Sequence, residues 1–475
     1  MPQVHVVSPS SDRADDPAAA VAGALSAHFN TGATKSLSWR LSQLDALEHF
    51  LMEREQDILD ALHADLGKPA MEAFGSEIGL PLSELRLTRK NLASWMRPER
   101  VRTSPLAMPG RSYVYREPLG VTLIIAPWNY PFQLIVLPLI GAIAAGNCAA
   151  LKPSELAPNV SSLLANWLPK YVDRKAIRVL EGGVPETTAL LRQSWDHVFY
   201  TGNSRVGRIV MEAAAKHLAP VTLELGGKSP CIVDETADLD SAARRIAYGK
   251  FFNTGQTCVA PDYVLVHDHV HDALVNRLVS TIREFYGDDP KRSPDFGRIV
   301  NERHHARLTR LLDGMDVVTG GETDQSELYV APTILRNVKE DDPLMKQEIF
   351  GPILPVISVS SIGSAIGFVN RQAKPLALYV FARDEAVHDR ILEATSAGGT
   401  TINHVWLHIG VPELPFGGVG ESGMGAYHGR QSFETFSHRR SVLKKSTLPD
   451  PPILFPPYTA RKMHWFKKLF RARRS

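Results

Sequence analysis

Short apolar segments alternate with Ala-rich or amphipathic stretches from about Val114 onward, and this alternation constrains the fold more than any other feature of the chain. Such a pattern is typical of a doubly wound parallel sheet with helices on its faces. The expected strands are 121–125, 149–151, 178–180, 197–200 and 221–225 in a first block, and 229–233, 263–266, 353–359 and 378–381 in a second. We therefore predict an α/β fold with two such domains.

Length, charge and cysteine content narrow the class of protein. A chain of 475 residues is too long for one compact core. The formal net charge of +2 gives no general electrostatic argument for a nucleic-acid partner, and none is expected. Only Cys148, Cys231 and Cys258 are present, which excludes a disulfide scaffold and favours a reducing, cytoplasmic location.

The N-terminal part of the chain shows no targeting or membrane signal. Residues 1–16 lack a basic segment followed by an apolar core, so we expect a polar arm and no signal peptide. Leucines at helical spacing predict a helix from Leu37 to Leu62, with Gly67 as its stop signal. The apolar segment 121–151 is interrupted by prolines and asparagines, which favours a buried strand and helix over a membrane span.

The C-terminal tail differs from the rest. Prolines punctuate 449–457, and from Arg461 onward the chain has no acidic residue. Lys or Arg stands at 461, 462, 467, 468, 471, 473 and 474, and Met463, Phe466, Leu469 and Phe470 fall on one helical face. Two interpretations stay open: a helix that lies on an anionic membrane surface, or a docked or frayed terminal helix.

Cys258 is the most informative single residue. It lies in a small polar turn, Asn-Thr-Gly-Gln-Thr-Cys, whereas Cys148 and Cys231 have the apolar neighbours of structural cysteines. A thiolate is the reactive form, and a turn beside a helix start can lower the pKa of the thiol. We expect Cys258 to be a nucleophile.

Two further side chains complete a chemical set. Glu224 ends an apolar strand and precedes two glycines, so its carboxylate can reach a cleft and activate water. Asn129, in Ala-Pro-Trp-Asn-Tyr-Pro-Phe, can donate to an oxyanion together with the Cys258 backbone N–H. Taken singly, a capping or salt-bridging Glu and a turn-forming Asn are fair alternatives. A thiol, a carboxylate and an amide together are a nucleophile, a base for water and an oxyanion donor.

The nucleotide signal is weaker. No Gly-x-Gly-x-x-Gly sequence follows the first expected strand, so the usual dinucleotide fingerprint is absent. Gly202 and Gly207 follow the strand 197–200 instead, and such a pair can open a helix whose N-terminus faces a phosphate.

These motifs resemble the NAD(P)-dependent aldehyde dehydrogenase superfamily, most closely its class 3 branch. The resemblance runs from about Phe29 to Leu443 and is carried by Gly182–Thr188, Cys258–Tyr263 and Pro415–Gly425. It implies a homodimer that uses NAD or NADP to oxidise a medium- or long-chain aliphatic or aromatic aldehyde to the carboxylic acid. It further implies a thiohemiacetal and a thioester on Cys258.

The resemblance also assigns the cofactor residues. Gly202 and Gly207 match the pyrophosphate-side turn, Lys152 and Glu155 the adenosine-ribose pair, and Glu348 and Phe350 the residues at the nicotinamide ribose and ring. Glu155 should disfavour a 2′-phosphate, yet class 3 relatives often tolerate both cofactors. No His/Cys/Asp cluster with ligand spacing indicates a metal.

The implied architecture is a Rossmann-type cofactor domain, an α/β catalytic domain and a small β bridging element for oligomerisation. The expected boundaries are 1–16 for the arm, 17–109 and 120–226 for the cofactor domain, 227–428 for the catalytic domain, 110–119 and 429–447 for the bridging element, and 448–475 for the tail. After Thr401–Asn403 the class commonly has Asp, whereas this chain has His404 and then Trp406. This loop helps to line the substrate entrance in the class, so we expect these two residues to affect the substrate range.

Three other functions fit parts of this pattern. The same cysteine could serve an acyl-transferring enzyme, CoA-acylating or esterase, but Glu224 favours water as the acceptor. A non-catalytic homologue is disfavoured because Cys258, Asn129 and Glu224 are all present. A cysteine protease lacks an arguable His partner.

Overall fold

The computed structural model describes residues 16–104, 107–448 and 452–471, and it confirms the α/β fold class. The chain divides into two compact units. The first comprises Met1–Trp95 with Pro118–Ser437, and the second comprises Met96–Glu117 with His438–Ser475. The domain boundaries expected from the sequence remain predictions. The expected N-terminal arm lies outside the described residues apart from Asp16.

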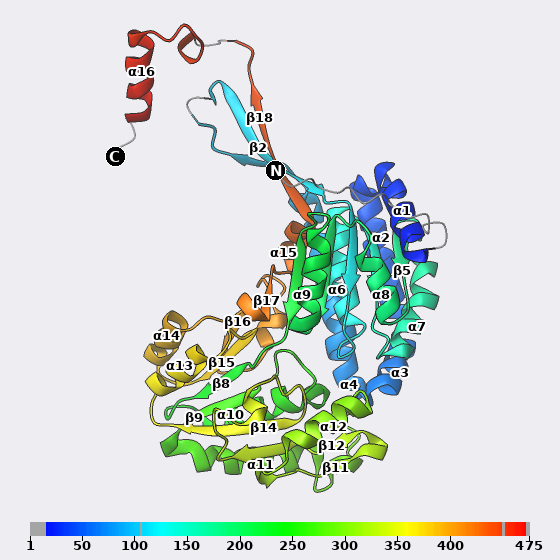
Figure 1. The fold of residues 1–475 in the computed structure, drawn as a ribbon, viewed down its shortest axis with the longest axis vertical. Coiled ribbons are helices and arrows are strands. Elements are labelled where there is room, and N and C mark those ends of the chain that lie inside the picture. Colours follow the sequence, from blue (N-terminus) through cyan, green and yellow to red (C-terminus); the bar gives the residue numbers. More distant parts are fainter. Residues whose placement is uncertain (1–15, 105–106, 449–451, 472–475) are drawn as a thin grey trace, which may run out of the picture. The chain divides into compact units, whose positions relative to one another are not determined.

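Two mainly parallel sheets form the first unit (Figure 1). Both contain the strands expected from the apolar segments, because parallel strands are buried on both faces. The six-stranded sheet has the order β17 (Gly423–Met424), β7 (Val221–Leu225), β6 (His197–Gly202), β3 (Val121–Ile125), β4 (Cys148–Lys152) and β5 (Ile177–Val179). The seven-stranded sheet has the order β10 (Asp316–Thr319), β13 (Thr333–Arg336), β14 (Ile353–Val359), β9 (Tyr263–His267), β8 (Pro230–Val233), β15 (Ala377–Phe381) and β16 (Gly399–Ile402).

In these two sheets the apolar pattern missed three edge strands, β17, β10 and β16, and one interior strand, β13, which has only four residues. β17 and β10 pair antiparallel at the edges of their sheets, and β16 is the opposite edge of the second sheet. Edge strands are short or partly exposed here, so they lack a continuous apolar run. A further two-stranded ladder joins β11 (Thr323–Asp324) to β12 (Tyr329–Val330).

Helices flank the sheets, and their starts follow the expected capping chemistry. The side chains of Ser36, Asn203, Asp238 and Asn301 each accept a backbone N–H at the start of a helix. The helices before the second sheet are α1 (Pro17–Asn30), α2 (Leu37–Glu53), α3 (Glu55–Leu66), α4 (Ala70–Ala73), α5 (Leu80–Trp95), α6 (Gln133–Ala145), α7 (Pro158–Trp167), α8 (Val184–Leu191) and α9 (Ser204–Ala215). Those that follow are α10 (Leu239–Phe251), α11 (His271–Tyr286), α12 (Glu302–Leu311), α13 (Ile362–Arg371), α14 (Glu385–Ala394) and α15 (Gly429–Thr435).

The single helix expected over 37–62 is wrong, since α2 and α3 are separate helices that meet at Arg54. The Arg54 guanidinium lies 3.6 Å from the Trp167 ring centroid and donates to the Tyr171 hydroxyl at 3.1 Å. These contacts hold Arg54 outside helical geometry, at φ −109° and ψ 18°. Gly67 does end α3, in the left-handed conformation that the stop signal requires.

The apolar segment 121–151 forms β3, the fully buried helix α6 and part of β4. Its interpretation as buried interior is therefore confirmed. Across the described ranges, the structure has no helix with both the length and the apolar character that crossing a bilayer requires.

The second unit is small. Its sheet has the order β1 (Glu99–Val101), β2 (Gly110–Pro118) and β18 (Ser437–Lys445). The tail contains one helix, α16 (Ala460–Arg471), as the apolar spacing predicts. Arg473 and Arg474, which belong to the expected basic tail, lie outside the described residues.

Candidate active site

One cavity of about 680 Å³ opens at the carboxyl ends of β3, β4, β6 and β7. This edge is where open α/β sheets bind ligands. The cavity brings together nearly all of the side chains singled out from the sequence: Asn129, Lys152, Glu155, Gly202, Glu224, Cys258, Glu348 and Phe350. Gly207 does not line it. A Cβ there would lie 2.9 Å from a methyl carbon of Leu225, so this glycine lets α9 approach β7.

The turn before Cys258 has unusual backbone geometry. Asn253, Thr254 and Gly255 are successively left-handed, with φ of 51°, 55° and 72°. A Cβ on Gly255 would lie 2.3 Å from the Gly351 carbonyl oxygen. Left-handed non-glycine residues cost about 1–3 kcal/mol each and persist where the surroundings fix them. The Asn-Thr-Gly sequence thus folds into a tight reversal that places Cys258 in the cavity wall.

The Cys258 thiol is held mainly in its neutral form. Burial raises its pKa to about 12, and the carboxylates of Glu348 and Glu224 add to the shift. The expectation of a lowered pKa is therefore wrong for the protein without its cofactor. No helix begins at Cys258, and the backbone N–H groups of Cys258 and Val259 offset only part of the desolvation. These two N–H groups nevertheless supply donors beside the sulfur.

Glu224 stands out among the acidic residues of the site because its carboxylate lacks hydrogen bonds to the described residues. It lies near the end of β7 and is only 2% exposed. Neither carboxylate oxygen has a hydrogen-bond partner among the described residues. Burial without a partner raises the pKa of Glu224 well above its usual value. A carboxyl group with these surroundings can exchange a proton with a water molecule in the cavity.

Asn129 is fixed by a network of amides that sequence reasoning missed. Its side-chain nitrogen donates to the Gln256 carbonyl at 3.0 Å, and its backbone carbonyl accepts from the Asn253 side chain at 2.9 Å. The Gln256 side chain in turn donates to the Arg298 carbonyl and accepts the Val300 N–H. Asn129 also lines the cavity.

A buried ion pair also holds the loop that carries Asn129. The Lys68 ammonium pairs with Glu77 and also donates to the Asn129 carbonyl at 3.1 Å. Glu77 accepts the backbone N–H groups of Phe132 and Gln133 at the start of α6. Neither residue stood out in the sequence, because Lys and Glu are ordinary surface residues until the fold buries them.

The nucleotide end of the cavity has the features that a dinucleotide requires. Gly202 and Asn203 precede α9, whose first N–H groups lack intrahelical partners and suit a phosphate. Val184 on α8 and Ile209 on α9 line the cavity yet are 73% and 50% exposed, as expected of a slot for a flat base. Lys152 lies 3.5 Å from Glu155, a pair that can bind ribose hydroxyls.

Glu348 lies at the other end. Its carboxylate packs so closely on Gly226 that a Cβ there would lie 2.0 Å from the nearer oxygen. The Gly227 N–H donates to it, its other oxygen has no partner in the described part of the chain, and burial raises its pKa to about 8. Phe350 presents its ring edge-on to Trp128, with centroids 5.4 Å apart. An unsatisfied carboxylate beside an aromatic wall suits a ribose hydroxyl and a ring, so the residues present fit NAD or NADP.

The loop with His404 and Trp406, which departs from the class pattern, packs through aromatic side chains. Trp406 stacks on Tyr248 and packs against Phe252, with both centroid distances 5.2 Å. Neither His404 nor Trp406 lines the cavity itself. Their effect on substrate range stays a prediction.

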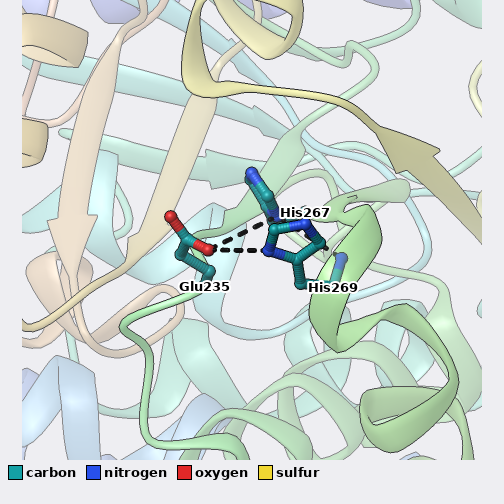
Figure 2. Close-up of side chains that lie close together, drawn as sticks. All are labelled: Glu235, His267 and His269. Carbon is teal, nitrogen blue, oxygen red and sulfur yellow. Dashed lines mark hydrogen bonds and ion pairs between the residues drawn. The ribbon is translucent and has the colours of Figure 1, made fainter.

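A separate cluster, Glu235, His267 and His269, lies at the ends of β8 and β9 (Figure 2). Sequence reasoning missed it because Glu235 comes from a different strand end. The Glu235 carboxylate contacts His269 Nδ1 at 3.0 Å, and His267 Nδ1 accepts the His269 N–H at 3.4 Å. Carboxylate–imidazole pairing and a backbone cap account for these contacts.

An α/β unit whose cavity at the strand ends brings together a cysteine, a carboxylate and an amide suits a dehydrogenase. The sequence model described as "Aldehyde dehydrogenase family" matches residues 3–442, and the chain belongs to that family.

Known relatives agree with this assignment. A dimeric, NADP-preferring aldehyde dehydrogenase of Rattus norvegicus is 52% identical over 420 residues, covering 88% of this chain and 93% of the relative. The 4,4'-diaponeurosporen-aldehyde dehydrogenase of Staphylococcus aureus is 49% identical, covering 94% and 97%. The substrate-bound structure of Staphylococcus aureus AldH has a TM-score of 0.93 at 48% identity, covering 95% and 99%. The predicted family, its class 3 resemblance and NAD(P)-dependent aldehyde oxidation are thereby confirmed.

Proposed function

We propose that this aldehyde dehydrogenase works by covalent catalysis with Cys258, Asn129 and Glu224 in distinct roles. The observation that carries the proposal is their convergence on one cavity, with a thiol in its wall and a carboxylate free of any described partner. The Cys258 thiol gives its proton to solvent, and the thiolate bonds to the aldehyde carbon as the carbonyl π electrons pass to the oxygen. The Asn129 amide and the Cys258 N–H donate to the resulting thiohemiacetal oxyanion.

The second half of the reaction needs a base for water. Lys152, Glu155, Glu348 and Phe350 would hold NAD or NADP, which would supply a hydride acceptor. Once the former aldehyde carbon has lost its hydride, it is a thioester on Cys258. Glu224, once ionised, takes a proton from water as that water attacks the thioester carbon, and the carbon–sulfur bond then breaks. The carboxylic acid leaves and the thiol is restored. The unpartnered Glu224 carboxylate favours water over coenzyme A as the acceptor.

Rapid-mixing measurements of NAD(P)H formation test these roles. Wild type, Cys258→Ala and Glu224→Gln are mixed with an aldehyde and each cofactor. Cys258→Ala should form no NAD(P)H. Glu224→Gln should form up to one equivalent in a burst and then turn over at least about 10²-fold more slowly, because only the hydrolytic step needs the base. Full turnover in Cys258→Ala, or an unchanged steady state in Glu224→Gln, would overturn the assignment.

The substrate is proposed to be a medium- or long-chain aliphatic or an aromatic aldehyde. Apolar and aromatic side chains make up much of the wall near Cys258, among them Trp128, Phe350, Leu376, Phe416 and Tyr427. A panel of short, long-chain and aromatic aldehydes measures the range. Highest kcat/KM with acetaldehyde would contradict it, since a two-carbon substrate gains little from an apolar wall.

A homodimer is proposed through the sheet of the second unit. The rat relative is named dimeric. Val101 and Leu443 are large, exposed apolar residues on β1 and β18. Sedimentation of the wild type and of Leu443→Lys would compare the two masses. A dimer in the wild type that Leu443→Lys weakens is expected, and a monomeric wild type would contradict the proposal.

Membrane contact through α16 is also proposed. The second unit contains sixteen Lys and Arg against three Asp and Glu, a formal +13 in a chain of net charge +2. Trp465 and Phe470 on α16 are 52% and 59% exposed beside Lys467 and Lys468. Basic helices with exposed aromatic residues bind anionic lipid.

Vesicle sedimentation separates this role from catalysis. Full-length protein should bind vesicles containing phosphatidylserine but not neutral ones, and the binding should weaken at high salt. Trp465→Ser with Phe470→Ser should lose at least half of the binding without a change in turnover. Equal binding by protein that ends at residue 458 would exclude the helix as the contact.

A further inference from the structure

Arg205 is the one feature of the nucleotide end that no assigned role explains. It stands in the first turn of α9, directly after the Gly202–Asn203 turn, and it lines the same cavity as Lys152 and Glu155. Its side chain is exposed. Among the described residues no carboxylate forms an ion pair with Arg205, whereas Arg208 on the same helix lies 4.0 Å from Glu421 and Lys152 pairs with Glu155.

Carboxylates surround Lys152, so a 2′-phosphate on the adenosine ribose would need a second cation besides Lys152. Glu155 lies 3.5 Å from the Lys152 ammonium, and Glu181 and Glu186 also act on it electrostatically. A 2′-phosphate on the adenosine ribose would thus meet carboxylates that neutralise the nearest ammonium.

We propose that Arg205 determines whether NADP is accepted, by binding the 2′-phosphate that distinguishes NADP from NAD. This inference rests on the cofactor site of the proposed function. A guanidinium is always charged and presents a fork of N–H donors that matches phosphate oxygens. NAD has a hydroxyl where NADP has this phosphate, so NAD gains nothing comparable from Arg205.

Calorimetric titration with 2′,5′-ADP and 5′-AMP tests the inference without turnover. Arg205→Gln should weaken the binding of 2′,5′-ADP by at least about ten-fold and that of 5′-AMP by less than about two-fold. Only 2′,5′-ADP has the phosphate that loses a charge-assisted contact. Arg205→Lys should bind 2′,5′-ADP with an affinity between those of the wild type and of Arg205→Gln. Arg208→Gln is the matched control, with the same charge change on the same helix outside the cavity lining, and it should bind both nucleotides like the wild type.

Each other outcome has a defined meaning. Equal weakening of both nucleotides in Arg205→Gln, no weakening of either, or an equal loss in Arg208→Gln would overturn the role of Arg205. Wild type that binds 5′-AMP but not 2′,5′-ADP would do the same and leave the proposed function intact. Wild type that binds neither would reject the cofactor site itself. Steady-state kinetics should follow the titrations, with KM for NADP rising in Arg205→Gln while kcat and KM for NAD stay within about two-fold.

Discussion

The side-chain amide of Asn129 donates to the backbone carbonyl of Gln256 at 3.0 Å, which ties the loop after β3 to the turn that carries Cys258. We propose two tasks for this amide: one N–H ties the two loops together, and the other donates to the oxyanion. Preorganised donors of this kind act because they need no rearrangement when charge develops.

Asn129→Ala should lower the single-turnover rate of NAD(P)H formation by about 10²–10³-fold, since an oxyanion donor disappears. Asn253→Ala is the matched control for the anchoring task. Asn253 bonds the same Gln256 carbonyl at 3.1 Å but does not line the cavity. Asn253→Ala should lower the stability of the protein, but it should slow NAD(P)H formation by less than about ten-fold. Equal losses of rate in the two variants would show that Asn129 only holds the loop.

Alkylation of Cys258 without cofactor should speed up with pH and reach no plateau. The pKa is raised to about 12, so the thiolate fraction grows about ten-fold per pH unit between pH 7 and 10. Iodoacetamide incorporation, measured by mass spectrometry with Cys258→Ala as the control, checks this. Glu348→Gln should be alkylated faster at pH 9, because Glu348 is ionised there and raises the pKa of the thiol. A plateau near pH 8 would contradict the structure.

Lys250→Met should stabilise the protein at neutral pH. Lys250 on α10 is fully buried, and its ammonium has no hydrogen-bond partner within the described ranges. Burial lowers its pKa from 10.5 to about 8. Because the folded value is the lower one, the cost of Lys250 is complete below pH 8 and is relieved as pH rises toward 10.5.

Urea unfolding at several pH values measures the effect of Lys250→Met. The free energy of unfolding should rise by about 2 kcal/mol at pH 7, and the gain should shrink at pH 9.5. A loss of stability at pH 7 would mean that Lys250 has a partner in solution.

Gly255→Ala should be far more harmful than Gly32→Ala. Both glycines have positive φ, 72° and 78°. A Cβ at Gly32 meets nothing within 4 Å, whereas one at Gly255 lies 2.3 Å from the Gly351 carbonyl. We expect a loss of about 1 kcal/mol at Gly32, which is the conformational cost alone, and at least about 3 kcal/mol at Gly255. Equal losses in thermal or urea unfolding would show that the turn at Gly255 can relax.

The sequence by itself determined the parts of this protein that depend on neighbours along the chain. Apolar runs located the buried strands β3 to β9, and Gly67 located the end of α3. The setting of Cys258 marked it as different from Cys148 and Cys231, which the fold does bury completely. Such signals are local, so they can be read before the chain is folded.

Only the tertiary structure decided how the site is charged and held. Burial by distant segments raises the pKa of Cys258 and Glu224, although a short polar turn favoured a lowered thiol pKa. The Lys68–Glu77 pair and the Gln256 network come from elements far apart in the chain. Arg54 splits an otherwise continuous helix because Trp167 and Tyr171 lie beside it. Desolvation and partner geometry depend on packing, and no spacing within the sequence encodes them.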